Sequence, residues 1–357
     1  MYKPRFVITN KILRWICQAE VAKEIVLTSP LIPAWEVKFR EDAAIRAVHH
    51  GTHIEGNELT IGEVKGALQG REVVARERDI QEVFNYRNIV KYIDKWSEGA
   101  EELSKPIDLG TVFTLHKISM EKMLPEERLG VFRDVDVVLK NSRTFVTSYK
   151  PPSKLNVPAL MKFFLDWLNS DLAQEVHPVL RAGIVHYELA RIHPFVDGNG
   201  RVGRALATLV LFKSGFDTKR FFSLEEFYDK NAARYYEALQ HASNQLVVDE
   251  SERDLTFWLE FFSEGLAVEL SRVKERVKKL SVDLKLAAKI GQVTLNERQV
   301  TMVEYMEDYG SINNSEWRNL LPDYSDDTLL RDMNDLIEKG LVKKEGKTKA
   351  AKYILVK

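Results

Sequence analysis

The segment His193–Arg204, with the sequence HPFVDGNGRVGR, combines a histidine, a carboxylate, glycines and two arginines. The imidazole of His193 titrates near neutral pH and is suited to accept a proton from a hydroxyl group. The carboxylate of Asp197 is a hard oxygen ligand for Mg²⁺, which usually binds through few protein ligands together with phosphates. The segment therefore predicts proton transfer beside a phosphate-bearing ligand.

Gly198, Asn199 and Gly200 let successive backbone N–H groups converge at the start of a helix, an arrangement that binds anions. Arg201 and Arg204 follow three residues apart, so both side chains project from the same side of that helix. Guanidinium groups match phosphate oxygens well. A tight capped turn would account for the glycines alone. It does not account for a histidine, a carboxylate and two arginines on one loop.

Two buried helices must hold this loop, and the flanking sequence supplies both. Apolar residues at helical spacing predict one helix over 178–192 and another over 200–213. Alternating residues favour a single β-hairpin within 130–149. Further helices are expected at 9–26, 42–53, 64–68, 76–96, 109–120, 157–169, 231–245 and 254–287. The expected fold class is therefore mainly α.

The C-terminal part of the chain predicts a separate small domain. The expected elements are three helices and a hairpin, at 296–308, 314–320, 325–339, 340–346 and 351–355. This order is typical of a winged helix-turn-helix domain. The third helix is mostly acidic, whereas contact with phosphates needs basic residues. The hairpin is basic, with Lys343, Lys344, Lys347, Lys349 and Lys352. DNA binding and protein interaction or dimerisation both remain open.

Composition bounds the class of protein. The 357 residues are enough for two or three domains. A net charge of −1 favours neither nucleic acids nor membranes as partners. The single cysteine, Cys17, excludes a disulfide framework and a Cys-based zinc site, and its apolar helical setting predicts a buried thiol. No signal peptide or membrane span is expected, which favours a soluble, cytoplasmic protein.

The segment His193–Arg204 resembles the defining pattern of the Fic family, His-Pro-Phe-x-Asp/Glu-Gly-Asn-Gly-Arg-x-x-Arg, and matches each fixed position. The resemblance extends over about residues 8–287. It implies a helical core with a hairpin flap at about 133–149, which aligns a target segment by strand pairing. It also implies a protein adenylyltransferase, which uses ATP and Mg²⁺ to place AMP on Ser, Thr or Tyr hydroxyls of target proteins.

The resemblance assigns a role to individual loop residues. His193 is the general base, Asp197 holds Mg²⁺, and Phe195 packs beneath the loop. Arg204 binds the γ-phosphate. The α- and β-phosphates are assigned to four residues, Gly198, Asn199, Gly200 and Arg201.

The resemblance also points to an adenine site. Asn231 matches the position where family members contact the base. Tyr235 either forms a wall of the same pocket or belongs to the core as part of an amphipathic helix.

Fic proteins also carry an inhibitory helix with the pattern Ser/Thr-x-x-x-Glu-Gly/Asn, and Glu55-Gly56 resembles the end of this pattern. Glu55 is then expected to pair with Arg204 and to prevent the γ-phosphate of ATP from seating. The Ser/Thr position is occupied here by Gly51, and Thr52 stands one place later. The N-terminal placement resembles the class of Fic proteins that inhibits itself in cis.

These features suggest four regions: 1–110 with the inhibitory helix, 111–250 as the catalytic core, 251–290 as a linker helix and 291–357 as the winged helix. The expected partners are ATP, a target protein and the chain itself, with a homodimer as a further option. Two alternatives remain open. One is a DNA-binding regulator that senses nucleotide. The other is a Fic-fold transferase that uses another donor or removes AMP.

The histidines at positions 49, 50 and 53 form a further cluster. Imidazoles suit Zn²⁺, but helical spacing brings only some of these rings to one face. Helix packing or solvent exposure is therefore the favoured interpretation.

Overall fold

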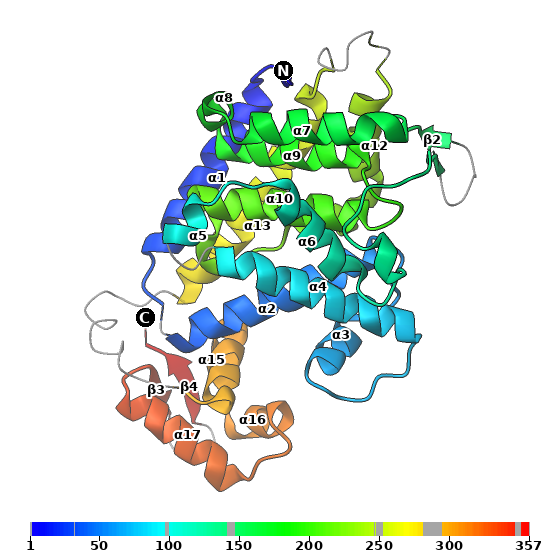
Figure 1. The fold of residues 1–357 in the computed structure, drawn as a ribbon. Coiled ribbons are helices and arrows are strands. Elements are labelled where there is room, and N and C mark those ends of the chain that lie inside the picture. The colour runs from blue at the N-terminus through cyan, green and yellow to red at the C-terminus, as the bar shows by residue number, and fades with distance from the viewer. Residues whose placement is uncertain are drawn as a thin grey trace. The chain divides into compact units, whose positions relative to one another are not determined.

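The computed structural model describes residues 2–31, 33–96, 100–140, 147–245, 247, 253–280, 295–346 and 351–356. It is mostly helical, as the sequence predicts (Figure 1). The chain forms two compact units. The first consists of Met1–Lys23 and Asp42–Arg272, and the second of Glu24–Glu41 and Val273–Lys357.

The core of the first unit is built around helices α9 (Pro178–Ile192) and α10 (Asn199–Leu211), which pack against each other along their length (Figure 1). Both are buried on nearly every face, as expected for helices that are apolar almost all round. Helices α4 (Glu77–Trp96) and α6 (Leu109–Met120) cover α10, and α7 (Val157–Leu168) covers α9. The loop between α9 and α10 is thus held by a packed scaffold.

The remaining helices that contribute to the first unit are α1 (Asn10–Thr28), α2 (Pro33–His53), α3 (Ile61–Leu68), α5 (Ala100–Ser104), α8 (Asp171–Glu175), α11 (Leu224–Lys230), α12 (Ala232–Ser243) and α13 (Thr256–Leu280). Parts of α1, α2 and α13 belong to the second unit. Helix α2 begins at Pro33, well before the expected start at residue 42. Proline fits the first turn of a helix because it lacks the N–H that would have no partner there. The expected end of α13, at 281–287, lies outside the described residues.

The hairpin consists of β1 (Leu139–Lys140) and β2 (Thr147–Tyr149), which pair antiparallel. Strand β1 begins at Leu139, later than the alternation of residues suggested, and Val135 lies before it. The buried guanidinium of Arg133 donates hydrogen bonds to the carbonyl oxygens of Val135, at 2.9 Å, and of Pro152. These backbone carbonyl oxygens therefore accept hydrogen bonds from a side chain instead of from a neighbouring strand. Residues 141–146, the expected turn, lie outside the described residues.

The second unit contains α15 (Glu297–Tyr309), α16 (Asn314–Leu320), α17 (Asp326–Glu338) and the antiparallel strands β3 (Val342–Glu345) and β4 (Lys352–Leu355). The expected order of helices and strands is confirmed. Side chains of Asn296, Asn313 and Ser325 accept hydrogen bonds at the three helix starts, which explains where each helix begins. Two of the expected basic residues, Lys347 and Lys349, lie outside the described residues.

Two observations bear on the remaining expectations. No helix among the described residues is long and apolar enough to cross a membrane. Cys17 is exposed, so the expectation of a buried thiol is wrong. The buried face of α1 is formed by Ile12, Ala19, Ala22 and Val26, and Cys17 lies on a different face of the helix.

Candidate active site

His193 ends helix α9 in a left-handed backbone conformation, with φ 52° and ψ 58°. Its backbone N–H donates to the Leu189 carbonyl at 3.0 Å, and its carbonyl oxygen accepts from Nε of Arg133 at 2.8 Å. The ring atom Nδ1 lies 3.3 Å from the carbonyl oxygen of Ala190. A proton on Nδ1 fits this contact, so the lone pair of Nε2 is left to accept a proton.

The electrostatic setting keeps the His193 ring neutral. Burial lowers the pKa of His193 to about 4, because the charged imidazolium would lose solvation. The hydrogen bond to Ala190 opposes this shift, and the nearby Arg133 guanidinium reinforces it. The ring is therefore in its proton-accepting form at neutral pH, as a general base requires.

The loop after His193 is closed by the side chain of Asn199. Its Oδ1 accepts from the backbone N–H of Phe195 and its Nδ2 donates to the Phe195 carbonyl, both at 2.9 Å. The Phe195 ring is fully buried beneath the loop. The amide of Asn199 thus holds the loop together. Only its backbone N–H at the start of α10 is left for the expected phosphate contact.

His116 of α6 supports the same loop, and sequence reasoning did not find it. Its ring stacks on Phe195 with 3.8 Å between ring centroids. Its Nδ1 accepts from the backbone N–H of Gly130 at 2.9 Å, and Nε2 lies 3.1 Å from the Asp197 carbonyl oxygen. Burial lowers the pKa of His116 to about 4. A lone histidine in an apolar helix gives no signal for this role in the sequence.

The two glycines of the loop meet different requirements. Gly198 has a positive φ of 81°, and a Cβ there would lie 2.8 Å from Sδ of Met120. A Cβ on Gly200 would lie only 2.5 Å from Oε1 of Glu55. Gly200 therefore lets a carboxylate approach the N-terminus of α10, which is the position where that helix attracts negative charge.

Asp197 and Arg201 lie beside the expected anion cradle, which consists of Gly198, Asn199 and Gly200 at the start of α10. Oδ1 of Asp197 accepts from the backbone N–H of Gly198 at 2.6 Å and lies 3.4 Å from Nη2 of Arg201. The Asp197 side chain is 44% exposed, whereas Arg201 is buried and its Nη1 lies 3.5 Å from Oε1 of Glu82. Arg78 approaches the other Asp197 oxygen at 3.8 Å.

The donor set fits Mg²⁺ better than a cation held by protein alone. Across the described ranges, no group of three or more His, Cys, Asp or Glu side chains is arranged to hold a metal ion. One accessible carboxylate, at Asp197, is the arrangement expected for Mg²⁺ that takes its other ligands from phosphates and water.

Arg204 and Glu55 form an ion pair at the cradle. Nη2 of Arg204 donates to Oε1 of Glu55 at 2.7 Å and to the carbonyl oxygen of Gly51 at 3.1 Å. The Arg204 side chain is only 2% exposed. Burial alone would raise the pKa of Glu55, but Arg204 and Arg201 outweigh it and hold that pKa below its usual value. The carboxylate is thus ionised and lies at the start of α10.

The two residues expected at the adenine site lie in different surroundings. Asn231 joins α11 to α12, and its Nδ2 donates to the carbonyl of Phe227 at 2.9 Å. Tyr235 is 3% exposed, and its hydroxyl lies 2.9 Å from Nε2 of His186. Its ring packs among the rings of Tyr228, Trp258 and Phe261. Tyr235 therefore belongs to the aromatic core, and the contact of Asn231 with adenine stays a prediction.

The histidine cluster connects α2 with α11. Nδ1 of His50 and Nδ1 of His53 each lie 2.7 Å from one carboxylate oxygen of Asp229. The ring of His49 stacks edge-on against His50 at 4.6 Å. These contacts assign the cluster to helix packing, and they fix the end of α2 close to the loop that carries Asn231.

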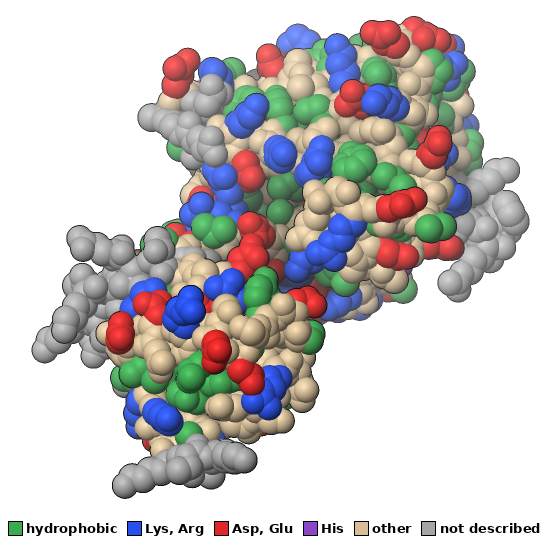
Figure 2. Space-filling view, turned by 90° about the horizontal axis from the view of Figure 1, so that it is seen from below, with side chains coloured by type: hydrophobic (Ala, Val, Ile, Leu, Met, Phe, Trp, Pro, Cys, Tyr) green, Lys and Arg blue, Asp and Glu red, His purple; other side chains and the backbone are tan. Residues whose placement is uncertain are grey.

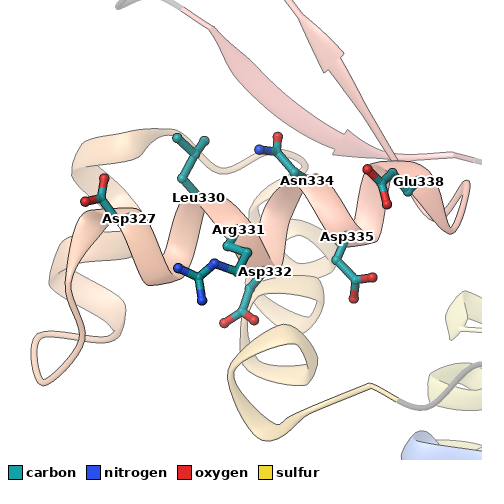
Figure 3. Close-up of a pocket in the computed structure, with 7 residues that line it drawn as sticks. All are labelled: Asp327, Leu330, Arg331, Asp332, Asn334, Asp335 and Glu338. Atoms are coloured by element: carbon teal, nitrogen blue, oxygen red, sulfur yellow. The ribbon is translucent and has the colours of Figure 1, made fainter.

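In the second unit, α17 presents a row of acidic side chains along an open cavity of about 590 Å³ (Figure 3). Two of them have partners, because Arg298 binds Asp332 and Gln299 donates to Asp335. Asp327 and Glu338 line the same cavity. Acidic and basic side chains are also interspersed on the molecular face drawn in Figure 2. The acidic row along α17 is the opposite of what a helix needs in order to bind phosphates.

Comparison with known proteins finds similarity in the part of the chain that carries this site. Residues 106–211 match the family model described as Fic/DOC family, and this range contains the whole of His193–Arg204. Two solved structures share the fold. A Fic family protein from Desulfovibrio desulfuricans G20 is 22% identical, with a TM-score of 0.65 over 99% of this chain and 98% of its own. A Fic domain containing signaling protein from Bacteroides thetaiotaomicron is 21% identical, with a TM-score of 0.62 over 77% of this chain and 99% of its own.

Curated relatives match over part of the chain. Protein adenylyltransferase Fic of Drosophila willistoni is 30% identical over 179 residues, which is 50% of this chain and 34% of that protein. The protein of the same name from Aedes aegypti is 28% identical over 228 residues, or 61% of this chain and 42% of that protein. The chain thus spans well under half the length of these relatives.

Proposed function

We propose that this chain, whose residues 106–211 match the Fic/DOC family model, is a protein adenylyltransferase, which transfers AMP from ATP to hydroxyl groups of target proteins and of itself. One observation carries the proposal. A neutral, proton-accepting His193 and a cradle for phosphates occupy the same short loop, between two buried helices.

Different residues of the loop serve different parts of the proposed reaction. The hydroxyl oxygen of a Ser, Thr or Tyr side chain attacks the α-phosphorus of ATP while Nε2 of His193 takes its proton. The bond between the α-phosphorus and the bridging oxygen breaks, and pyrophosphate leaves. Arg201, Arg204 and the N–H groups at the start of α10 hold the β- and γ-phosphates as negative charge develops there. Mg²⁺ held by Asp197 would supply further neutralisation of the phosphate charge.

The hairpin β1–β2 is suited to present the target. Arg133 ties the start of this segment to the carbonyl oxygen of His193, so the hairpin and the proposed base keep a fixed relation. An extended target segment that pairs with a strand edge would bring its hydroxyl to a defined position. Such pairing reads the backbone, so it sets little preference for sequence.

We further propose that the site is held inactive by Glu55. Its carboxylate occupies the anion cradle beside Gly200 and binds Arg204, the group assigned to the γ-phosphate. Two negative groups cannot share this position without strong repulsion. ATP therefore binds without its γ-phosphate in place until Glu55 withdraws.

The test is intact-mass spectrometry of Glu55→Gly protein incubated with ATP and Mg²⁺. An added mass of AMP on this variant, and much less on wild type, is the expected result. Glu55→Gly combined with His193→Ala is the control and should gain no mass. An added phosphate would assign a kinase reaction instead. No added mass on Glu55→Gly, and none on a mixture of candidate target proteins, would remove the proposal.

A further inference from the structure

Gly51 occupies the position where the inhibitory pattern of Fic proteins has a serine or threonine, and the structure shows what stands in its place. A Cβ on Gly51 would lie 2.3 Å from Cζ and 2.6 Å from Cε1 and Cε2 of Tyr86. Contacts this short do not occur between real atoms, so a side chain at position 51 requires either the ring or the helix to move.

The Tyr86 ring has little freedom to move. It lies on α4, is 1% exposed, and donates a hydrogen bond from its hydroxyl to Oε1 of Glu225 at 3.0 Å. The other oxygen of Glu225 accepts from the hydroxyl of Ser223 at 2.9 Å. The ring is therefore fixed at both ends, by its own helix and by α11.

The contact with Tyr86 sets how the last turn of α2 meets Arg204. With no side chain at Gly51, the helix backbone lies directly on the ring, and the Gly51 carbonyl oxygen reaches Nη2 of Arg204 at 3.1 Å. The same nitrogen binds Glu55 at 2.7 Å. One guanidinium nitrogen is thus held by a backbone carbonyl and a carboxylate from the same turn.

The neighbouring hydroxyl does not replace the missing one. Thr52 is buried, and its hydroxyl donates within α2, with the carbonyl oxygens of Val48 and His49 at 2.9 and 3.0 Å. Its hydroxyl is thus used for hydrogen bonds within its own helix.

We propose that Tyr86 is a positioning residue of the inhibitory clamp, which takes the space of the absent hydroxyl side chain and seats the backbone of Gly51 on Arg204. The inference rests on the proposed function, because its readout is AMP transfer. It has an unusual consequence. Restoring the usual residue by Gly51→Thr, or adding a single methyl by Gly51→Ala, weakens inhibition, because α2 must lift away from Tyr86.

The experiment measures self-labelling with ATP in four variants that differ in positions 51 and 86. Gly51→Ala is expected to label about tenfold more than wild type, the size of effect that an overpacked buried contact typically produces. In a Tyr86→Ala background, the same Gly51→Ala change is expected to have less than about a twofold effect, because the methyl group then has room. Equal effects in the two backgrounds, or none in either, would overturn the inference.

Three further variants make the outcome decisive. Gly62→Ala adds a methyl group to α3, where only the Thr60 hydroxyl oxygen lies as near as 4.0 Å, and should label as wild type does. Glu55→Gly must label strongly. If it does not, the proposed function fails, and not the role of Tyr86. Tyr86→Phe keeps the ring but removes the hydroxyl, which binds Glu225 and also interacts with the guanidinium of Arg204, and labelling between wild type and Glu55→Gly is expected. It decides the matter if Gly51→Ala does not fold, and wild-type labelling would then contradict the inference.

Discussion

Two helices of this chain invite the expectation of phosphate binding, and they differ in how their charges are arranged. At the start of α10, Arg201 and Arg204 are buried, and both lower the pKa of one carboxylate, that of Glu55 just after the end of α2. Arg204 also binds this carboxylate directly. Along α17, the side chains that line the cavity are mainly acidic, and two of them are bound by neighbouring residues (Figure 3). Convergence of buried cations, and not the presence of a helix with charged residues, is what favours the start of α10 as the proposed phosphate site.

The largest effect is expected at the proposed base. In the Glu55→Gly background, His193→Ala should reduce AMP transfer by about 10²–10⁴-fold, the usual contribution of a general base. Binding of ATP should change little, because no phosphate role is assigned to the imidazole. Initial rates of self-labelling and a nucleotide titration measure the two quantities. A variant that keeps more than about a tenth of its activity would show that the loop works without this base.

The next largest effect is expected at Arg204, one of the two buried arginines at the start of α10. Arg204→Ala in the Glu55→Gly background should lower AMP transfer about 10²–10³-fold, as loss of a charge-stabilising group in an active site typically does. Arg331→Ala, on α17, is the matched control and should leave the rate as it is. Equal losses for the two arginines would break the distinction between the two helices.

The side chain of Asn199, which closes the loop, is expected to contribute mainly to the stability of the fold. Asn199→Ala removes both hydrogen bonds to the Phe195 backbone, which leaves a buried N–H and a buried carbonyl without partners. The expected loss in the free energy of unfolding is about 1–3 kcal/mol for each such group. Thermal unfolding of wild type and variant gives the comparison, and an unchanged midpoint would remove this role of Asn199.

The pH dependence of AMP transfer should follow the lowered pKa of His193. Because burial lowers that pKa to about 4, the ring stays neutral as the pH falls through the usual histidine range. The rate of Glu55→Gly should therefore hold from pH 8 to about pH 5 and fall only below it. Loss of the Glu55 carboxylate shifts the His193 pKa further in the same direction. A rate that halves near pH 6.5 would contradict the buried setting of this ring.

The smallest effect is expected on α17. Asp327→Asn and Glu338→Gln together should leave AMP transfer within about twofold of the parent protein, because such surface substitutions usually have small effects. Binding of the parent protein to a DNA duplex at low salt provides the second readout. Binding that is strong, and falls steeply with added salt, would show that basic residues of the hairpin outweigh the acidic helix and would favour the DNA-binding alternative.

Much of the fold could be predicted from the sequence, because helical periodicity and the order of elements are local patterns. Helical periodicity predicted α9 and α10 around the loop, and the order of elements in the second unit followed from the same kind of pattern. The start of α2 and the short strands of the hairpin were not predicted. Pro33 is compatible with both a loop and a first helical turn, and the carbonyl oxygen of Val135 accepts a hydrogen bond from Arg133, two residues earlier, instead of joining a strand.

The site could be predicted only in part, because sequence patterns show only residues that lie close together in the chain. The chemistry of the loop follows from consecutive residues, whereas the supports of the loop come from other helices. His116 reaches the loop from α6, and Arg133 reaches it from the segment before the hairpin. Gly51 departs from the family pattern, and the ring that lies against it, that of Tyr86, comes from a helix far along the sequence. No local pattern encodes such contacts.

In the proposed mechanism of inhibition, Glu55 and the γ-phosphate of ATP compete for Arg204. The competition can be measured as the affinities of ATP and ADP for His193→Ala protein, which does not turn over, with Glu55 present and with Glu55→Gly added. With Glu55 present, the two nucleotides should bind about equally, because the γ-phosphate has no seat. With Glu55→Gly, ATP should bind at least about tenfold more tightly than ADP, as a regained charge-assisted contact of about 1.5–3 kcal/mol allows. An ATP-to-ADP ratio that is the same in both proteins would contradict the proposed competition.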